Sequence, residues 1–591
     1  MLCVGEYYHM CGISVVISKI NINESYLQTF HSLIKHRGPD ESYYYSKNDN
    51  SIKSSGLNKD KADRFFGAFL RNNSKTCYKS FFVGHHRYKI YCKGNSGIQP
   101  VVDQQNKFCL LFNGSIYNYK EICNKNKVSH SDTDVLFECL NENFEETLST
   151  IDGPHAITYF NRQTQRIYIC RDFFGEKPLF YFLDDNTFIV SSEINAIAYL
   201  CKRLNKTLSY NRKFLNSYIV KDRLPLNKYT LFKEISPFKS NLLYNFNYRN
   251  WKIEFSNIQD KYRQSTLYAD YNYNELSDLL SNKIENSVLL KQNCDRPVGL
   301  FLSGGLDSNV ILNFINAKKD NYIGEFNILE DGKETEYETD IARTSCLKYK
   351  RTLNTINVKF SINENLLESY STNSDMPIHN PVFLLQDIGW RKFKELGGDV
   401  FLNGAGADEI FCGYQYYQNY FPLSKVNITS IKQLNFLKWL IKNILKRRLS
   451  YSNTNLGKIR LNDIFEERIP FWNYQIDKSS MSIPVEGRFP FLNKDLFAIM
   501  SNLNNLTLQM NYKNSKIIFR QLLRDRKFHD SVFRMEKRGF IRKENKDLVK
   551  LYNNYKSEIL PIVSDHIEIP KKFDKWKILS IWLFIKKYQS L

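Results

Sequence analysis

The sequence lacks the long apolar runs and the leader pattern that mark membrane and secreted proteins. No uninterrupted apolar stretch approaches the roughly 18 residues that a membrane-spanning helix needs. The N-terminus has no basic segment followed by an apolar one. We therefore expect a soluble, cytoplasmic protein with no membrane partner.

Cysteine pairs at metal-binding or redox spacing are also missing. The 12 cysteines are scattered, and none forms a Cys-x-x-Cys pair or a Cys/His ligand spacing. Several of them, such as Cys109, Cys139 and Cys170, lie in or beside apolar runs, as small buried side chains do. Free thiols of this kind suit a reducing cytosol.

Acidic residues are too few to balance the basic ones, and the net charge is +21. Such an excess favours an anionic partner such as nucleic acid. The charge is nevertheless spread along a chain rich in Lys, Asn, Ile and Tyr, and no nucleic-acid motif accompanies it. We attribute it to compositional bias and expect no nucleic-acid partner.

The 591 residues, of which 42% are hydrophobic, are too many for one core and too apolar for disorder. The first third alternates short β-branched runs with turns, the pattern of a strand-rich domain. From about residue 275 the pattern becomes strand, loop and helix, which favours a parallel α/β sheet. We predict strands over Val298–Leu302, Tyr322–Ile328 and Val400–Leu402, and interpret the polar region 240–272 as a linker.

The most informative motif follows the first of these strands. The run from Pro297 passes from an apolar strand into Ser-Gly-Gly-Leu-Asp-Ser and then into an apolar-periodic helix. Glycines let the backbone approach a phosphate, and the start of a helix directs free N–H groups and a positive dipole end at it. Asp307 can hold magnesium against the same oxygens. An ordinary strand-turn-helix is the alternative, and the lack of Gly-Lys-Ser/Thr excludes a Walker loop.

This motif resembles the pyrophosphate loop of ATP pyrophosphatases, which split ATP into AMP and pyrophosphate to activate a carboxylate or carbonyl. The resemblance implies that ATP binds over consecutive loop residues. These are Ser303, Gly304, Gly305, Leu306, Asp307 and Ser308.

A second constellation lies in the first third of the chain, where the lone Cys11 stands just before the first strand. Four polar islands follow it, namely His36–Asp40, Gly84–Arg87, Phe112–Asn118 and Ser131–Asp134. Each island alone could be a turn or a helix cap. Together and in this order they resemble the glutaminase domain of the class II glutamine amidotransferases, whose nucleophile is an N-terminal cysteine.

The resemblance implies roles for individual residues. The thiolate of Cys11 attacks the side-chain amide of glutamine, and the α-amine of the same residue is the base. The Asn113 side chain and the Gly114 N–H form the oxyanion hole, and Asn113 also contacts the bound glutamine. Arg87 clamps the glutamine carboxylate, and Asp132 holds its ammonium group.

Two departures bear on this glutaminase site. Ser115 stands where the family has Glu, which removes one contact to the substrate amine. Residues 1–9 precede Met10, although the mechanism needs a free α-amine on Cys11. We interpret Met10 as the native start, so that residues 1–9 are a non-native or removable extension. A cleaved pro-segment and an inactive glutaminase are the alternatives.

The two parts together resemble the glutamine-hydrolysing asparagine synthetases over nearly the whole chain. Further islands that carry the resemblance are Arg171–Leu179, Ser192–Ile194, Leu402–Glu409, Gly413–Tyr414, Met481, Glu486–Leu492, Ser515–Arg520 and Arg538–Phe540. The implied fold is an N-terminal α+β αββα sandwich of the N-terminal-nucleophile type, followed by a C-terminal α/β parallel sheet with the pyrophosphate loop and helical additions. We place the glutaminase domain at 10–215, a linker and domain-closing segment at 216–274, and the synthetase domain at 275–591.

The implied reaction uses ATP, Mg²⁺ and glutamine. Asn403 and Gly404 extend the pyrophosphate site, and Asp307 and Asp408 hold the metal. The acceptor carboxylate attacks the α-phosphate to give an acyl-adenylate, which ammonia from the glutaminase then attacks. Lys516 neutralises charge that builds on the phosphates. Members of the family are often homodimers.

The acceptor is the least constrained part of this reaction. Ala405 stands where the family has a Glu that lines the acceptor pocket, Asn403 replaces a Ser, and Asn493 replaces an Asp. We expect aspartate as the acceptor. The alternatives are another carboxylate, such as a polysaccharide uronic acid or a natural-product intermediate, and a degraded paralogue that senses nucleotide or glutamine. The basic stretch Leu434–Arg448 is expected to be a solvated amphipathic helix.

Overall fold

A computed structural model describes most of the chain. The described residues are 11–38, 40–48, 51–56, 59–71, 78–90, 96–122, 131–221, 224–258, 271–330, 333–377, 380–420, 453–483, 485–503, 509–510, 514–534 and 546–590. The predicted extension 1–9, the basic stretch 434–448 and the island 538–540 lie outside them. Within the described residues, every helix is too short or too polar to cross a membrane.

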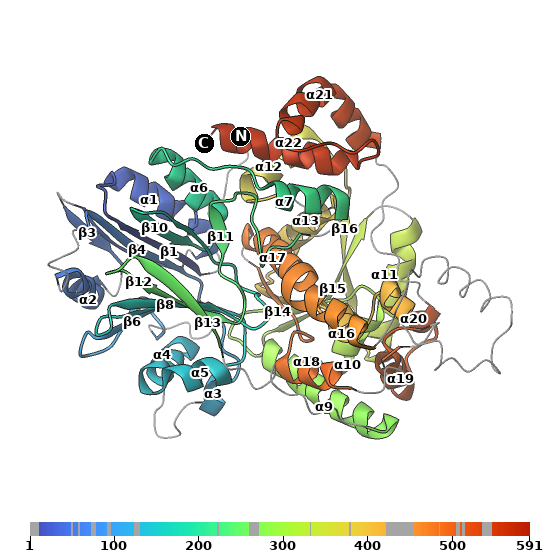
Figure 1. Cartoon of the computed structure of the whole chain (residues 1–591). Helices are drawn as coiled ribbons and strands as arrows, with labels where there is room; N and C mark the ends of the chain where they lie inside the picture. Colours follow the sequence, from blue (N-terminus) through green and yellow to red (C-terminus); the bar gives the residue numbers. More distant parts are fainter. Residues whose placement is uncertain are drawn as a thin grey trace.

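Two antiparallel sheets lie face to face in the first part of the chain (Figure 1). The first has the strand order β11-β9-β10-β1-β4-β2-β3. Its strands are β1 (Gly12–Ser18), β2 (Glu41–Lys47), β3 (Ile52–Ser55), β4 (Ser80–Arg87), β9 (Phe180–Leu183), β10 (Thr187–Ser191) and β11 (Ile235–Pro237). The second has the order β13-β12-β8-β7-β6-β5. Its strands are β5 (Val101–Val102), β6 (Phe108–Gly114), β7 (His155–Asn161), β8 (Arg166–Arg171), β12 (Leu242–Asn247) and β13 (Lys252–Asn257).

Alternating side chains make this part a four-layer sandwich. On β1, Ile13 and Val15 enter the apolar layer between the sheets, whereas Val16 faces helices on the outer side. Helices α1 (Glu24–Ser32) and α6 (Ile194–Arg203) cover the first sheet, and α4 (Asp132–Glu142) and α5 (Phe144–Thr150) cover the second. Helix, sheet, sheet and helix therefore follow one another, in the predicted αββα order.

The segment 216–274 differs from the predicted linker. Strands β12 and β13 pair with each other, and β12 also pairs with β8 inside the second sheet. Tyr244 and Phe246 are buried between the sheets, and the residues that alternate with them are partly exposed. The polar composition of the outer face concealed this alternation, so β12 and β13 complete the second sheet, and residues 242–257 of the segment are not a linker.

The second part contains the predicted parallel sheet, in the order β16-β15-β14-β17-β18. Its strands are β14 (Val298–Phe301), β15 (Tyr322–Glu330), β16 (Leu353–Val358), β17 (Val400–Leu402) and β18 (Glu486–Arg488). The helices around it include α9 (Tyr273–Gln292), α10 (Leu306–Phe314), α11 (Lys333–Lys348), α12 (Glu364–Asn373), α13 (Val382–Glu395), α14 (Ala407–Ile410), α16 (Asn453–Asn462), α17 (Arg468–Met481), α18 (Lys494–Ser501), α19 (Ile517–Asp525) and α20 (Ser531–Arg534). The strand order reverses between β14 and β17, and ligands of such sheets bind beyond the carboxyl ends of the strands at this point.

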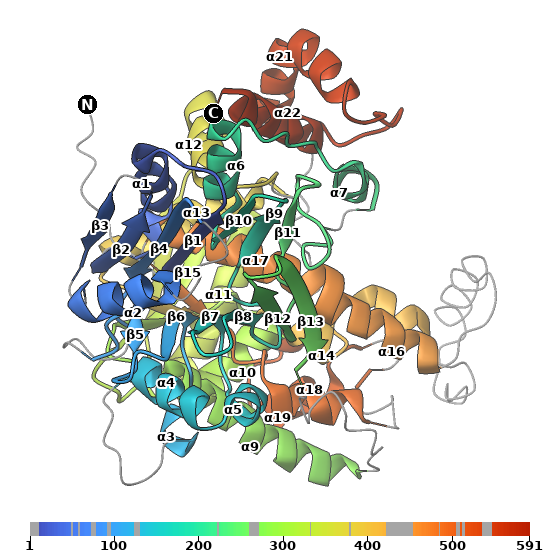
Figure 2. The same ribbon diagram turned by 60° about the vertical axis from the view of Figure 1, so that its left-hand side comes forward.

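The C-terminal helices α21 (Lys546–Ser564) and α22 (Lys575–Ser590) pack on each other, and α22 reaches back to the sandwich (Figure 2). The Tyr588 hydroxyl donates a hydrogen bond to the Asn195 side chain at 2.6 Å, and the Tyr588 ring stands edge-on to Phe232. One apolar cluster contains residues of α6, α12 and α22. The two parts of the chain therefore share a core at this end of the molecule.

Candidate active sites

The loop after β14 leads directly into α10. Gly305 caps this helix without a side-chain hydrogen bond, so the N–H groups of its first turn face outward. The Ser308 hydroxyl accepts a hydrogen bond from the Ser303 N–H at 3.2 Å and thereby folds the loop around the helix start. This is the arrangement that binds anions at helix N-termini.

The loops after β14 and β17 are in close contact, and glycine makes this possible. A Cβ on Gly404 would lie 2.7 Å from the Cβ of Asp307. A Cβ on Gly413 would lie 1.9 Å from a carboxylate oxygen of Asp408. Larger residues at these two positions would push the two aspartates out of place.

Lys516 brings the two predicted metal-binding carboxylates together. Its Nζ lies 2.5 Å from Asp307 Oδ1 and 2.6 Å from Asp408 Oδ1. Burial lowers the pKa of Lys516, and the neighbouring Asp307 opposes this shift. Two carboxylates that converge on a cation beside an anion-binding loop fit Mg²⁺, which takes one or two protein carboxylates together with substrate phosphates. In the described ranges, no group of three or more His, Cys, Asp or Glu side chains lies at metal-binding spacing.

The residues at which the sequence departs from the family that it resembles have local structural contacts. The Asn403 side chain accepts a hydrogen bond from the Ala405 N–H at 2.9 Å. Asn493 caps α18 by accepting a hydrogen bond from the N–H of Leu496. The neighbouring Glu409 is buried and accepts a hydrogen bond from the Tyr414 hydroxyl at 2.6 Å. Ala405 itself offers no acid or base.

The thiol of Cys11 is buried at the start of β1. Its Sγ donates a hydrogen bond to the carbonyl of Tyr88 at 3.9 Å. Burial raises the pKa of Cys11 to about 11, against the lowering effects of the Tyr88 carbonyl and Arg87. The negative charges of Asp132 and Glu486 also act to raise the pKa of this thiol. The thiol is therefore protonated at neutral pH, and a nucleophilic role requires a base.

Arg87 lies at the end of β4, beside the loop that precedes the second sheet. Its guanidinium pairs with Glu41 at 2.8 Å. A Cβ placed on Gly97 would lie 3.0 Å from Arg87 Nη2 and 2.6 Å from Ser131 Oγ. The end of β4 and the start of α4 therefore meet at Gly97. This proximity is expected if Arg87 and Asp132 bind the same glutamine molecule.

Asp132 begins α4 and is 5% exposed. One of its oxygens accepts a hydrogen bond from the Ile116 N–H at 2.9 Å. Burial raises its pKa to about 6, although this backbone hydrogen bond acts in the opposite direction. Its charge can therefore change close to neutral pH.

Asn113 lies near the end of β6 and is fully buried, and Gly114 follows it as the last residue of that strand. Neither polar atom of the Asn113 side chain has a hydrogen-bond partner among the described residues, and the Ser115 hydroxyl has none either. An unsatisfied buried polar group costs about 1–3 kcal/mol. Groups of this kind in a folded protein call for an explanation, and a catalytic role is one of the known ones.

Two contacts of this site were not predicted from the sequence. Glu41 holds the guanidinium of Arg87, and the Tyr88 carbonyl faces the thiol of Cys11. Both residues stand directly beside motif residues, at the C-terminal ends of the islands that finish with Asp40 and Arg87. Their position next to the motifs was the one sequence feature that could have identified these two residues.

Two family models match the chain, one in each part, and the first match does not include Cys11. Residues 72–256 match a glutamine amidotransferase domain, and residues 279–565 match asparagine synthase. The fold and the two sites thus define an enzyme in which a glutamine amidotransferase is joined to an ATP-using synthetase.

Curated relatives agree with both matches. A Methanocaldococcus jannaschii protein that bears a glutamine-hydrolysing asparagine synthetase name is 26% identical over 445 residues, which cover 69% of this chain and 76% of the relative. Asparagine synthetase 1 of Bacillus subtilis is 25% identical, and the match covers 70% of this chain and 60% of the relative. Asparagine synthetase B of Escherichia coli is 23% identical, and the match covers 65% of this chain and 60% of the relative. The chain belongs to the glutamine-hydrolysing asparagine synthetase family and is a glutamine-hydrolysing ligase.

Proposed function

We propose that this enzyme converts aspartate to asparagine, with glutamine as the nitrogen donor and ATP cleaved to AMP and pyrophosphate. The observation that carries the ATP-cleaving part of the proposal is the convergence of Asp307 and Asp408 on Lys516 at the point where the strand order reverses. A domain that only binds nucleotide has no need of two carboxylates and a buried lysine at the phosphates. A domain that cleaves ATP at the α-phosphate needs these groups, because charge on the phosphates has to be neutralised during the reaction.

The first half-reaction releases ammonia from glutamine. Arg87 and Asp132 orient the substrate, and Cys11 attacks the amide carbon while the Asn113 amide and the Gly114 N–H receive the oxyanion. The C–N bond then breaks and ammonia leaves, and water hydrolyses the resulting glutamyl thioester to glutamate and the free thiol. Because burial raises the pKa of Cys11 to about 11, its proton needs an acceptor, which the free α-amine of the same residue provides. We therefore propose that residues 1–10 are absent from the active enzyme. An intact mass that matches a chain beginning at Cys11 supports this, and an active chain beginning at Met1 contradicts it.

The second half-reaction activates the acceptor. The phosphates of ATP lie over residues 303–308, with Asn403 and Gly404 beside them. Mg²⁺, held by Asp307 and Asp408, supplies positive charge to the phosphate oxygens when bound. Lys516 adds a second positive charge there. The acceptor carboxylate attacks the α-phosphorus and pyrophosphate leaves; ammonia then attacks the acyl carbon, AMP leaves and one proton is released.

Ala405 favours a second class of acceptor, a carboxylate other than aspartate. A neutral, small side chain in place of the family's Glu leaves space and removes a charge, which would admit a carboxylate larger than aspartate. Under this alternative the chemistry is the same and only the acid differs. The aspartate proposal rests on the names of the relatives, and the alternative rests on this one residue.

One assay distinguishes the acceptors. The enzyme is incubated with ATP, Mg²⁺ and glutamine, with and without aspartate, and pyrophosphate and asparagine are measured. We expect aspartate-dependent pyrophosphate with an equal amount of asparagine. Turnover with another acid but none with aspartate would favour the alternative. No turnover with any acid, even when ammonium replaces glutamine, would indicate a degraded paralogue.

Glutamine binding should weaken as pH falls below about 6. Burial raises the pKa of Asp132 to about 6, and only the ionised carboxylate can hold the ammonium group of glutamine. The KM for glutamine should therefore rise roughly tenfold for each pH unit below that value. Asp132→Asn should give a high KM that no longer changes over this range. A wild-type KM that stays constant between pH 5 and 7.5 would contradict the role of Asp132, and ammonium-dependent turnover over the same range is the control.

A further inference from the structure

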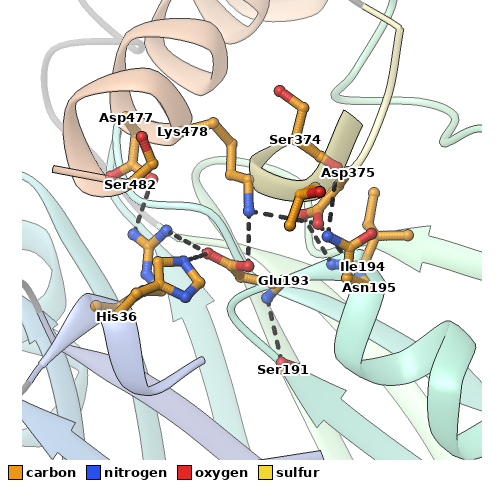
Figure 3. Close-up of polar contacts among 12 residues, drawn as sticks. His36, Ser191, Glu193, Ile194, Asn195, Ser374, Asp375, Asp477, Lys478 and Ser482 are labelled. Carbon is orange, nitrogen blue, oxygen red and sulfur yellow. Dashed lines mark hydrogen bonds and ion pairs between the residues drawn. The ribbon is translucent and has the colours of Figure 1, made fainter. Parts of the chain in front are cut away.

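A buried ionic cluster joins the two parts of the molecule next to Cys11 (Figure 3). The sandwich contributes His36, Arg37 and Glu193, and the synthetase part contributes Asp375, Asp477 and Lys478. Except for His36, these side chains are at most 5% exposed. Figure 3 shows Asp477 and Lys478 on a helical ribbon, with their side chains directed at the sandwich residues.

Two ion pairs of the cluster, Lys478 with Glu193 and Arg37 with Asp477, join the two parts of the chain. Lys478 Nζ lies 2.6 Å from Glu193 and 3.3 Å from Asp375. The Arg37 guanidinium lies 3.2 Å from Glu193 and 2.7 Å from Asp477. Although burial acts to raise it, the charges around Glu193 hold its pKa well below the ordinary value. Glu193 is therefore ionised, and the removal of one of its partners would leave its buried charge uncompensated.

The synthetase part also caps a helix of the glutaminase. The N-cap residue of α6 is Glu193, and its side chain makes no capping hydrogen bond. The carboxylate of Asp375 accepts instead, from the N–H groups of Ile194 at 3.1 Å and Asn195 at 3.3 Å. The start of α6 is thus completed by a residue from the other domain.

The cluster and the neighbouring Ser192 contact the main chain at Cys11 and just after it. Arg37 Nε donates a hydrogen bond to the carbonyl of Cys11 at 3.4 Å. The hydroxyl of Ser192, next to Glu193, accepts a hydrogen bond from the Ile13 N–H at 3.0 Å. Helix α17, which carries Asp477 and Lys478, is therefore connected to Cys11 through one side chain, Arg37.

We propose that Asp477 and Lys478 are positioning residues for glutamine hydrolysis. Helix α17 holds Arg37 and Glu193, and these fix the backbone of Cys11 relative to the oxyanion hole. The glutaminase is consequently complete only when the synthetase domain is seated on it. This arrangement prevents the release of ammonia where no acceptor site exists. The inference rests on the proposed role of Cys11 as the nucleophile.

The test separates the two activities of the whole enzyme. Asp477→Asn and Lys478→Met each remove one charge of the cluster, and neither residue touches the ATP site residues described above. Because displacements of about 1 Å can slow a reaction about a hundredfold, we expect the kcat for glutamate release to fall ten- to a hundredfold. The KM for glutamine and the rate of ammonium-dependent pyrophosphate release should stay within about twofold of wild type, because Arg87, Asp132 and the ATP loop lie elsewhere.

Two further variants keep the test specific. Glu466→Gln breaks a partly exposed ion pair between the two parts, with Lys228 at 3.6 Å, and should leave both activities unchanged. Lys478→Arg keeps the charge and should restore most of the glutaminase rate.

Three outcomes overturn the inference. Glutamate release by Asp477→Asn and Lys478→Met at the wild-type rate overturns it while the proposed function stands. A parallel loss of both activities that Lys478→Arg does not repair shows general damage to the fold. A wild-type enzyme that releases no glutamate removes the proposed function itself, and this inference with it.

Discussion

Replacing Asp307 with Ala is expected to abolish pyrophosphate formation with both nitrogen sources. Asp307 is placed where the N-terminus of α10, the loop after β17 and the Nζ of Lys516 meet. In the proposed site, loss of its carboxylate would leave Asp408 as the only proposed ligand for Mg²⁺, and Lys516 would lose one of its two counter-charges. Because electrostatic groups aimed at a transition state contribute about a hundred- to a thousandfold each, we expect at least a thousandfold loss of pyrophosphate release.

The same variant should leave the glutaminase intact. Glutamate release by Asp307→Ala without ATP should stay within about twofold of wild type, because Cys11 lies in a different domain. Asp340→Ala is the matched control, since Asp340 is an exposed carboxylate of α11 that pairs with Arg343. Substantial pyrophosphate release by Asp307→Ala would show that the loop at 303–308 is an ordinary turn.

Replacing Cys11 with Ala is expected to produce the opposite pattern. Glutamine-dependent pyrophosphate release and glutamate formation should fall by more than about a thousandfold, since no other group can form the thioester. Ammonium should still support pyrophosphate release at a rate close to wild type. The change is small in volume, and the start of β1 keeps its pairing with β4 and β10, so the fold should be retained.

A second buried cysteine provides the control for this variant. Cys170 lies on β8 inside an apolar cluster, and Cys170→Ala should retain both activities. If Cys11→Ala still uses glutamine, the assignment of the nucleophile is wrong. If it also loses ammonium-dependent turnover, the two sites do not act separately.

Strands with a clear apolar pattern were predictable from the sequence. The expected ranges that begin at Val298, Tyr322 and Val400 correspond to β14, β15 and β17. Strand β18 was not predictable, because Glu486-Gly487-Arg488 has neither apolar alternation nor β-branched residues. It is a strand because it pairs with β17, and its buried charges are satisfied by a contact between Glu486 and Arg488 at 2.7 Å. Tertiary context decided its conformation.

The candidate site shows the same limit. Motifs identified the loop around Asp307 and the island around Asp408 because each is continuous in sequence. The bridge formed by Lys516 joins residues 209 positions apart, and its ion pairs follow from the packing of α19 beside α10. The contact between Arg37 and Asp477 spans 440 positions. Such contacts arise from the docking of the two domains, which no local pattern records.

The fate of the glutamine amide nitrogen tests the central claim most directly. The enzyme is given ATP, Mg²⁺, aspartate and glutamine labelled with ¹⁵N in its side-chain amide, with unlabelled ammonium present at an equal concentration. The account predicts asparagine that carries ¹⁵N in its side-chain amide, together with equal amounts of AMP and pyrophosphate. Glutamate and pyrophosphate formed without any labelled asparagine would contradict it.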